Sequence, residues 1–309
     1  MAITGFTGTA QLGDSVQAET IADKVVKTAY CTAVADALIN ADSSWSGHDF
    51  ITGSTVKSYS RLGSLSAAAL TQGTDGTPTA LTDSQVSATV SECGVGVDYG
   101  DMLRFAQSSP GGKAKVAGLM GKAYGDYVDA TILGLASSFT DSVGAVDALT
   151  LDEFLQAIHE LEENQADGPF ASILHTAAIN NLRAALGGTS GSTAAVFARL
   201  GLDRIGPALI SGFCMNLYEV DVFKTTNSDQ NASETGWIGM LLPMSQDMPI
   251  VRTIARFPAD DPDWPNMAWD GRFEEERDAS GRLTEMWVTG CWGVAVIAAD
   301  FGVGILSTK

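Results

Sequence analysis

The stretch RFEEERDASGRLTEMWVTGCWGVAV, residues 272–296, changes abruptly from charged to uncharged and decides the architecture. Eight charged side chains fall within the fourteen positions from Arg272 to Glu285, whereas no Asp, Glu, Lys or Arg occurs from Met286 to Ala299. Charged side chains stay in water, and an uncharged run of this length requires burial. We interpret the stretch as a charged hairpin followed by a buried strand that continues to Leu306, with a turn near Asp300 to Gly304.

The composition is that of a folded protein. The chain has 309 residues, of which 45% are hydrophobic and 18% charged, enough for one large domain or two modest ones. Its 37 acidic and 18 basic residues give a formal charge of -19, which repels phosphate. The charge therefore argues against a nucleic-acid interface built on counterion release.

The cysteines and the N-terminus exclude other classes. Cys31, Cys93, Cys214 and Cys291 lack the spacing of zinc ligands, and three histidines do not complete a metal set with them, so we expect buried free thiols and no metal. The N-terminal MAITGFTGTAQLGDS lacks the regions of a secretory signal, and no window is apolar enough for a membrane span. The sequence predicts a cytoplasmic chain without membrane contact.

Two segments at the start of the chain are expected to extend from its body. Apolar residues recur at helical spacing from Val16 to Leu38, which predicts a helix that begins at Asp14-Ser15 and ends near Asn40. Residues 52–85 are rich in Gly, Ser and Thr, and the extended runs Ser54–Leu62 and Leu81–Val90 flank the turn-forming TQGTDGTP. A ribbon this poor in apolar residues is marginal alone, so it should lie against something else, a neighbouring copy being one candidate.

The middle of the chain predicts a bent strand and a long helix. The alternation of apolar residues changes parity between Val90 and Cys93, which indicates a bulge or bend near Glu92. A helix of about 27 residues should follow, with Gly118, Gly121, Gly125 and Gly134 marking the close approach of another backbone. Its predicted buried face comprises Val116, Leu119, Met120, Ala123, Tyr124, Tyr127, Val128, Thr131, Ile132 and Leu135.

Further elements follow from local signals. Thr150-Leu-Asp-Glu153 is a capping box that begins a helix. PFASILH predicts a buried strand, and TAAINNLRAALGG predicts a helix closed by glycine. Residues 204–224 and 236–256 resemble strands interrupted by Pro and Gly.

Catalytic signatures are weak. Gly94-Val-Gly96-Val-Asp-Tyr-Gly100 has one residue too many for a dinucleotide fingerprint, and no phosphate loop or GxSxG elbow occurs. His48-Asp49 is better interpreted as a turn than as part of a triad. Residues 259–270 could hold a hard cation through Asp260, Asp261, Asp263 and Asp270, but they lack the pattern of a calcium loop, so a solvated acidic loop is preferred. A metal-assisted hydrolase using this loop and His48 remains the alternative from another class.

The order of these elements resembles the major capsid proteins of tailed bacteriophages with the Hong Kong 97-like fold. GSTVKSYSRLGSLSAAALTQGTDGTP is similar to the family's extended loop, SATVSECGVGVDYGDMLRF to the strand that leaves it, and KVAGLMGKAYGDYVDATILGLAS to its spine helix, with Asp129 and Ile132 near the end. FASILHTAAINNLRAAL resembles the strand and helix of the axial domain. GWIGMLLP and FEEERDASGRLTEMWVTGCWGVAVIAADFGVGIL resemble the closing segment.

The resemblance implies an α+β Hong Kong 97-like fold divided into five parts. These are an N-terminal arm with a helix (residues 1–50), an extended loop (51–87), a peripheral domain with a long spine helix (88–147), an axial domain (148–284, an approximate boundary) and a return strand to the peripheral domain (285–309). It further implies a structural protein, without enzymatic activity, cofactor or metal. Copies would assemble as hexamers and pentamers into an icosahedral head that encloses DNA without specific binding. An encapsulin-like nanocompartment, which shares the fold, is the nearest alternative.

The resemblance also implies where copies touch. The expected inter-subunit contacts are Val56, Lys57, Tyr59, Arg61 and Leu62 of the extended loop, Val25, Val26 and Tyr30 of the arm, and Glu274, Glu275, Glu276 and Arg277 of the charged hairpin. Lys57 and Arg61 should meet carboxylates of a neighbour; Lys57 is expected to be an ordinary exposed lysine rather than a cross-linking one. Only about fourteen residues precede the first helix, so scaffolding should come from a separate protein, as should the portal and any cement protein. The expected location is the virion capsid, assembled in the host bacterial cytoplasm.

Overall fold

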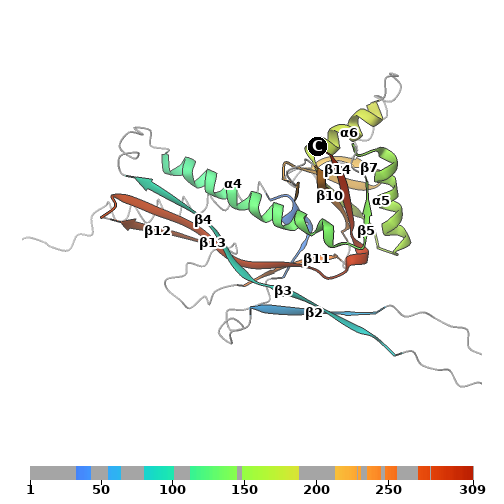
Figure 1. The fold of residues 1–309 in the computed structure, drawn as a ribbon, viewed down its shortest axis with the longest axis horizontal. Coiled ribbons are helices and arrows are strands. Elements are labelled where there is room, and N and C mark those ends of the chain that lie inside the picture. The colour runs from blue at the N-terminus through green and yellow to red at the C-terminus, as the bar shows by residue number, and fades with distance from the viewer. Residues whose placement is uncertain are drawn as a thin grey trace, which may run out of the picture.

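A computed structural model gives the arrangement of the chain. It describes residues 33–42, 55–63, 80–100, 112–144, 148–187, 213–227, 229–230, 235–244, 248–255, 271–278 and 280–308. These residues form two sheets, helices packed on them and a separate two-stranded ribbon (Figure 1).

The long strand β13 (Leu283–Val296) organises the first, five-stranded sheet. One of its edges pairs along its length with β4 (Ser91–Gly100), and the other pairs first with β12 (Gly271–Asp278) and then with β11 (Ile250–Ile254). β1 (Asn40–Asp42) extends the sheet beyond β11 in parallel. β12 and β13 form the charged hairpin expected from the sequence, and the uncharged strand lies in the sheet.

Helix α4 (Gly112–Leu133) runs along this sheet (Figure 1). The indole nitrogen of Trp292 on β13 donates a hydrogen bond to the Tyr124 hydroxyl at 2.9 Å, in the buried layer between helix and sheet. The buried side chains of α4 are Ala117, Met120, Tyr124, Val128, Asp129, Ile132 and Leu133. The expected spine helix and buried strand are therefore found side by side.

Three details of α4 differ from the sequence prediction. The helix has 22 residues instead of about 27 and continues as the 3₁₀ helix η2 (Gly134–Ser138). Leu119, Ala123 and Tyr127, predicted to be buried, are exposed, Leu119 by 68% and Tyr127 by 51%. The apolar stripe was wide enough to fix a helix but not which of its edges faces the sheet. A Cβ atom on Gly134 would meet nothing within 4 Å, so no backbone among the described residues approaches closely there.

The second sheet has seven strands, and two of the described helices pack on it. Its order is β5 (Asp141–Val143), β14 (Val303–Thr308), β10 (Thr235–Pro243), β6 (Phe170–His175), β8 (Val220–Thr225) and β7 (Phe213–Leu217), and β9 (Asp229–Gln230) also pairs with β10. Helices α5 (Leu151–Glu163) and α6 (Thr176–Gly187) pack on it through a shared apolar core. The predicted capping box at Thr150 is present, with Thr150 N–H donating to Glu153 Oε2 at 2.7 Å.

The chain crosses between the sheets more often than the sequence boundaries imply. β11 and β12 fall within residues 148–284, assigned to the axial segment, but they pair in the sheet of β4 and β13. β14 falls within the return segment, but it pairs with β10 and β5 of the other sheet. The crossing from β13 to β14 passes through the 3₁₀ helix η4 (Ala299–Phe301), where the turn was expected.

The predicted ribbon consists of β2 (Val56–Leu62) and β3 (Asp83–Thr89), paired antiparallel. β3 leads into β4 through Val90 alone, so one residue separates the strand of the ribbon from the strand of the sheet. The predicted change of parity is thus an interruption at Val90, two residues before Glu92. Residues 64–79, between the two strands of the ribbon, lie outside the described residues.

The end of the arm differs from the prediction of a helix to Asn40. Ala35–Leu38 form the 3₁₀ helix η1. Asn40–Asp42, where the predicted helix was expected to end, form the strand β1. Pairing with β11 accounts for the difference, because a sheet edge satisfies the backbone groups of these polar residues. Val25, Val26 and Tyr30 lie outside the described residues.

The fully buried carboxylate of Asp129 joins three parts of the chain. Its Oδ1 accepts the Ala35 N–H at 2.6 Å, and its Oδ2 accepts the Thr225 hydroxyl at 2.8 Å and the Asn227 amide at 3.4 Å. Next to it, Asp36 accepts a hydrogen bond from Arg252 at 2.6 Å, and the Arg252 guanidinium lies 4.8 Å from the centre of the Trp292 ring. The arm is thereby held to α4, to both sheets and to β13.

Burial raises the pKa of Asp129 above its ordinary value of 3.8, although its hydrogen bonds act in the opposite direction. The folded protein therefore binds this proton more tightly than the unfolded chain does. The contribution of Asp129 to the free energy of unfolding is fully present below the ordinary pKa and is lost as the pH rises through the raised pKa.

Asp129→Asn tests this linkage, because the amide has the same shape and does not titrate. We expect the unfolding free energy of the native chain, minus that of the variant, to decrease as the pH rises above the ordinary pKa of 3.8. Urea denaturation at a series of pH values measures it. A difference that is constant or that increases with pH would contradict the account.

Candidate assembly site

One face of the ribbon packs on its own chain. Tyr59, Val86 and Ala88 contact Val251, Ala295 and Ile297 on the face of the five-stranded sheet away from α4. The Tyr59 hydroxyl also lies 2.6 Å from the Thr253 hydroxyl of β11. The base of the ribbon is therefore fixed by an apolar contact and a hydrogen bond within one subunit.

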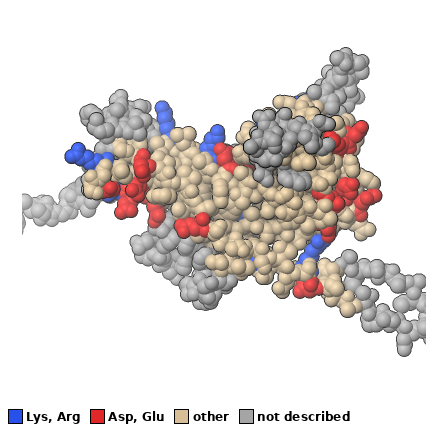
Figure 2. Space-filling model, in the orientation of Figure 1, with Lys and Arg blue, Asp and Glu red and all other residues tan. Residues whose placement is uncertain are grey.

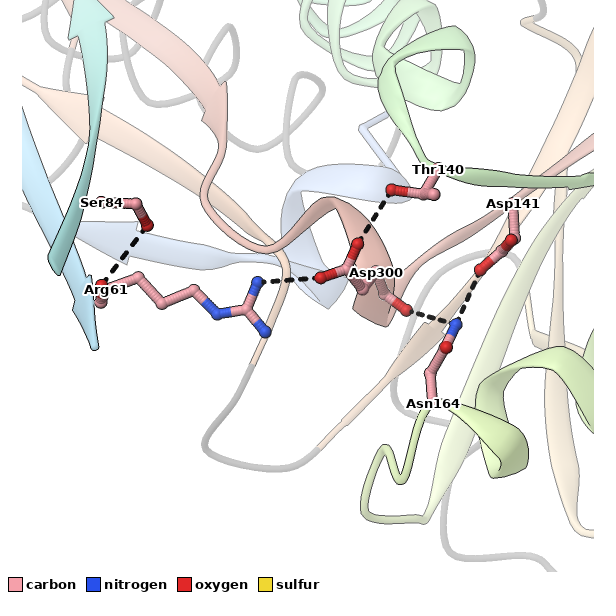
Figure 3. Close-up of polar contacts among 6 residues, drawn as sticks. All are labelled: Arg61, Ser84, Thr140, Asp141, Asn164 and Asp300. Atoms are coloured by element: carbon pink, nitrogen blue, oxygen red, sulfur yellow. Dashed lines mark hydrogen bonds and ion pairs between the residues drawn. The ribbon is translucent and has the colours of Figure 1, made fainter. Parts of the chain in front are cut away.

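A polar network centred on Asp300 fixes the ribbon further along (Figure 3). The Arg61 guanidinium lies 3.4 Å from Asp300 Oδ2, and the Thr140 hydroxyl donates to Asp300 Oδ1 at 2.9 Å. The Asn164 amide donates to the Asp300 carbonyl at 2.9 Å and to Asp141 Oδ2 at 2.6 Å. Since Asp300 lies in η4, between β13 and β14, the ribbon is linked to the crossing between the two sheets.

The Arg61–Asp300 ion pair orients the ribbon more than it stabilises the fold. The two side chains are partly exposed, and exposed ion pairs contribute about 0–1 kcal/mol. The guanidinium also stacks 4.7 Å from the centre of the Phe301 ring, and the Ser84 hydroxyl donates to the Arg61 carbonyl at 3.3 Å. These contacts hold Arg61 against the 3₁₀ helix η4 and against the neighbouring strand β3, which restricts the direction of the ribbon.

The opposite face and the outer end of the ribbon meet nothing among the described residues that buries them. Val56, Leu62 and Leu81 are 44%, 63% and 50% exposed. Between them the outward face carries small polar side chains, such as Ser58 and Ser87, whose hydroxyls lie 3.3 Å apart. Exposed leucines on a projecting ribbon offer a surface for a further contact.

The loop residues predicted from the sequence thus divide into two sets. Lys57, Tyr59 and Arg61 point toward their own subunit, and the carboxylate that Arg61 contacts belongs to the same chain. Lys57 is half-buried, with its Nζ 5.5 Å from the centre of the Tyr59 ring, and is not an ordinary exposed lysine. Val56 and Leu62 point outward.

A glycine permits the ribbon to cross the sheet where it does. A Cβ atom on Gly293 would lie 2.1 Å from the carbonyl oxygen of Thr89 and 2.7 Å from its carbonyl carbon. Any side chain at this position would push the base of the ribbon away from β13. The uncharged strand β13 therefore contributes a buried surface and, at Gly293, the space in which the backbone of the ribbon crosses it.

The hairpin residues Glu274–Arg277 occupy both faces of β12. Glu275, Glu276 and Arg277 are exposed and Glu274 is half-buried. Across the sheet, Glu276 pairs with Glu285 and Glu285 with Asp98, so three carboxylates lie in one cross-strand row. Figure 2 shows acidic side chains gathered at this end of the molecule and near α5, with a mostly uncharged surface between.

Two hydrogen bonds lie within the turn of this hairpin. Asp278 accepts the Ser280 N–H at 2.8 Å and the Ser280 hydroxyl at 2.6 Å. These bonds lower the pKa of Asp278 below its ordinary value, because they favour the charged form. These bonds link Asp278 to Ser280 across the turn.

The described residues offer no grouping for metal chemistry: no three His, Cys, Asp or Glu side chains converge among them. His159 lies on the exposed side of α5, 3.2 Å from Glu163, and His175 Nδ1 accepts the Ala177 N–H. His48 and the acidic residues Asp260, Asp261, Asp263 and Asp270 lie outside the described residues. None of the described helices combines the length and hydropathy that a membrane span requires.

Sequence reasoning missed Thr253, Asp300 and Gly293. Asp300 carried a signal, since it is the first charge after the uncharged run 286–299. Thr253 and Gly293 carried no signal in the sequence, because their roles depend on where the ribbon crosses β11 and β13.

Comparison with solved structures identifies the fold. The capsid of the cyanophage P-SCSP1u matches 88% of this chain and 87% of its own, with a TM-score of 0.58 and 12% identity. A structure from Mycobacterium phage Ogopogo matches 90% and 92%, with a TM-score of 0.59 and 12% identity. The SrpI encapsulin of Synechococcus elongatus PCC 7942 matches 87% and 84%, with a TM-score of 0.56 and 11% identity.

No protein-family model and no curated protein sequence matches the chain. At this level of identity the structural likeness establishes the fold. The chain has the α+β Hong Kong 97-like capsid fold, as its sequence predicted.

Gly293→Ala should destabilise the protein, because the added methyl overlaps the backbone of Thr89. We expect a loss of about 1–3 kcal/mol in unfolding free energy, the usual cost of overpacking. Gly100→Ala is the matched control: it lies in the neighbouring strand β4, and a Cβ there would meet nothing within 4 Å. Chemical denaturation measures both, and equal effects would contradict the role assigned to Gly293.

Proposed function

We propose that this chain is the major capsid protein of a tailed bacteriophage, and that its copies assemble as hexamers and pentamers into an icosahedral head enclosing the DNA genome. The observation that carries the proposal is the fold, shared with the cyanophage capsid over 88% of the chain and 87% of that protein. Agreement over nearly the full length of both chains supports a shell subunit more strongly than agreement over one domain would. The role is structural rather than enzymatic.

The two sheets supply the parts of such a subunit. We assign the five-stranded sheet with α4 to the peripheral domain and the seven-stranded sheet with α5 and α6 to the axial domain. On this assignment β11 and β12 belong to the peripheral domain, and β14 to the axial domain. The ribbon projects from the peripheral domain as the extended loop.

Contacts between copies are heterologous in a closed shell, since one surface of a subunit meets a different surface of the next. Val56 and Leu62 point away from their own subunit and are suited to meet a neighbour, whereas Lys57, Tyr59 and Arg61 set the direction of the loop. Val25, Val26 and Tyr30 of the arm and Glu274–Arg277 of the hairpin remain proposed contacts. The hydrogen bonds from Ser280 to Asp278 support the hairpin as a contact, because groups that are already restrained lose less entropy on binding.

The net charge of -19 fits enclosure of DNA without specific binding, because an acidic wall lets the genome be packed and released. Scaffold, portal and any cement protein would be separate chains, and assembly would take place in the host cytoplasm before the capsid becomes part of the virion. An encapsulin-like compartment is the second candidate. The match to the SrpI encapsulin, with a TM-score of 0.56, is as good as several phage matches.

Electron microscopy of the purified chain, alone and coexpressed with neighbouring genes, tests the proposal. Closed shells or capsomer rings are expected. Shells that hold nucleic acid would support the phage capsid, and shells that hold protein cargo would support the compartment. A chain that stays monomeric under both conditions would refute both candidates.

Leu62→Asp should block shell formation without unfolding the subunit, because the leucine is exposed in the single chain and would be buried by a neighbour. We expect particle yield to fall by about tenfold or more, since a buried unpaired charge costs several kcal/mol per contact. Leu62→Ile keeps the apolar surface and should assemble. An unchanged yield for the Asp variant in light scattering, with an unchanged melting temperature, would show that Leu62 is no contact.

A further inference from the structure

An exposed tryptophan lies on the five-stranded sheet, in the hairpin of β12 and β13. Trp287 of β13 is 44% exposed, although its neighbours Met286 and Val288 are buried in the core that α4 shares. Because successive side chains of a strand alternate between faces, Trp287 lies on the face away from α4, the face that the ribbon crosses at Gly293. Figure 1 shows the hairpin at the end of the molecule opposite α5. A large aromatic side chain is thus left in solvent at one end of the subunit.

The indole ring of Trp287 lies against the backbone of β4. Its cross-strand partner is Gly96, and a Cβ atom on this glycine would lie 2.6–2.7 Å from three carbons of the six-membered ring. The ring therefore occupies the space that a side chain at position 96 would need. It covers the strand instead of projecting from it, so part of its surface faces the sheet and the rest faces solvent.

Carboxylates border this ring. Glu274 of β12 is the other cross-strand partner of Trp287. Two residues nearer the turn, Glu276, Glu285 and Asp98 form a row across β12, β13 and β4, on the same face as the tryptophan. Like charges directly opposite one another destabilise a sheet, so this row would be stabilised by a cation placed over it.

The basic residues of the hairpin do not balance these carboxylates. Arg277 pairs with the buried Thr284, which places it on the α4 face, and Arg282 lies at the turn. Arg272 pairs with Thr289 and is on the face of Trp287, so four carboxylates share this face with one arginine. Among the side chains that the structure describes, none of the cations that lie over an aromatic ring lies over Trp287.

Two other places in the same chain show what a ring beside a carboxylate binds. The Arg252 guanidinium lies 4.8 Å from the centre of the Trp292 ring and donates to Asp36 at 2.6 Å. The Arg61 guanidinium lies 4.7 Å from the centre of the Phe301 ring and 3.4 Å from Asp300. In each case one planar guanidinium contacts the ring with its face and the carboxylate with its N–H groups.

We propose that Trp287, together with Glu276, Glu285 and Asp98, is a docking surface for an arginine side chain in a basic segment of a separate protein. A separate basic partner is favoured over a second copy, because copies with a net charge of -19 repel one another. A metal ion is not favoured, since no three carboxylates of the described residues converge on one point. The proposal concerns one face of the single subunit and does not rest on the proposed shell function.

Titration of the 309-residue chain with a dye-labelled hexa-arginine peptide, followed by fluorescence anisotropy, tests the surface. We expect saturable binding, and weaker binding of a hexa-lysine peptide, because an ammonium group lacks the planar face that stacks on the indole. No binding of the arginine peptide, or equal affinity for the two peptides, would overturn the proposal.

The ring is tested by Trp287→Leu, which keeps an apolar side chain and removes the aromatic face. We expect the affinity for the arginine peptide to fall by about fivefold. Tyr218→Leu is the matched control and should leave the affinity unchanged, because it removes a ring that is 50% exposed and adjacent to a carboxylate, Glu219, in the other sheet. Equal affinities of the Trp287 variant and the native chain would contradict the account.

The carboxylate row is tested by Glu285→Gln. We expect the affinity to fall by about threefold while the melting temperature does not fall, because the change also removes a repulsion between strands. These two readouts together exclude a trivial loss of folding. Glu162→Gln removes an exposed carboxylate of α5 and is the control. Equal weakening by both variants would show that the peptide responds only to net charge, which would refute a defined surface.

Sedimentation velocity separates a basic partner from a second copy. Trp287→Leu should leave the distribution of oligomers of the chain unchanged. A variant that dissociates those oligomers would assign the Trp287 surface to a second copy and overturn the proposal.

Discussion

The hydrogen bonds to the Asp129 side chain are the interaction on which the arrangement of the arm, α4 and the two sheets depends. A buried carboxylate is stable only where donors satisfy it, and here the donors come from the arm, from β8 and from the residues that follow β8. The neighbouring Asp36–Arg252 pair likewise links the arm to β11, and the Arg252 guanidinium lies over the Trp292 ring of β13. Two adjacent residues of a 3₁₀ turn thus link the spine helix to both sheets, and each unit is positioned by the arm as well as by its own core.

The ribbon depends on that rigid base. It leaves the sheet through a single residue, Val90, over the gap at Gly293, and its direction is set by Tyr59 on β11 and by Arg61 on the crossing helix η4. These contacts are weak individually, and they lie at different distances along the ribbon, so they restrict its angle more than they stabilise it. A projecting element that is held at its base and carries exposed leucines at positions 62 and 81 is the geometry that the proposed shell subunit would need in order to reach a neighbour.

The sequence predicted the elements better than their surroundings. Periodicity and caps located the spine helix, the capped helix α5, the ribbon and the charged hairpin with its buried strand, because these are local patterns. The sequence did not indicate which edge of α4 is exposed. The apolar stripe of this helix is wider than the face that the sheet covers, so only the packing against the sheet decides which side chains are buried. The sequence also missed β1, whose polar residues become a strand only because β11 offers an edge, and the pairing of β14 with β10. Thr253 and Gly293 were invisible for the same reason: their importance arises from a crossing of strands distant in sequence.

A reconstruction of assembled particles at side-chain resolution tests the central claim most directly. The account predicts that Tyr59 and Arg61 keep their contacts to Thr253 and Asp300 of the same chain while Leu62 and Leu81, exposed in the single subunit, become buried against a neighbour. Particles in which these leucines remain in solvent, or in which Tyr59 and Arg61 bind a neighbouring copy instead, would contradict it.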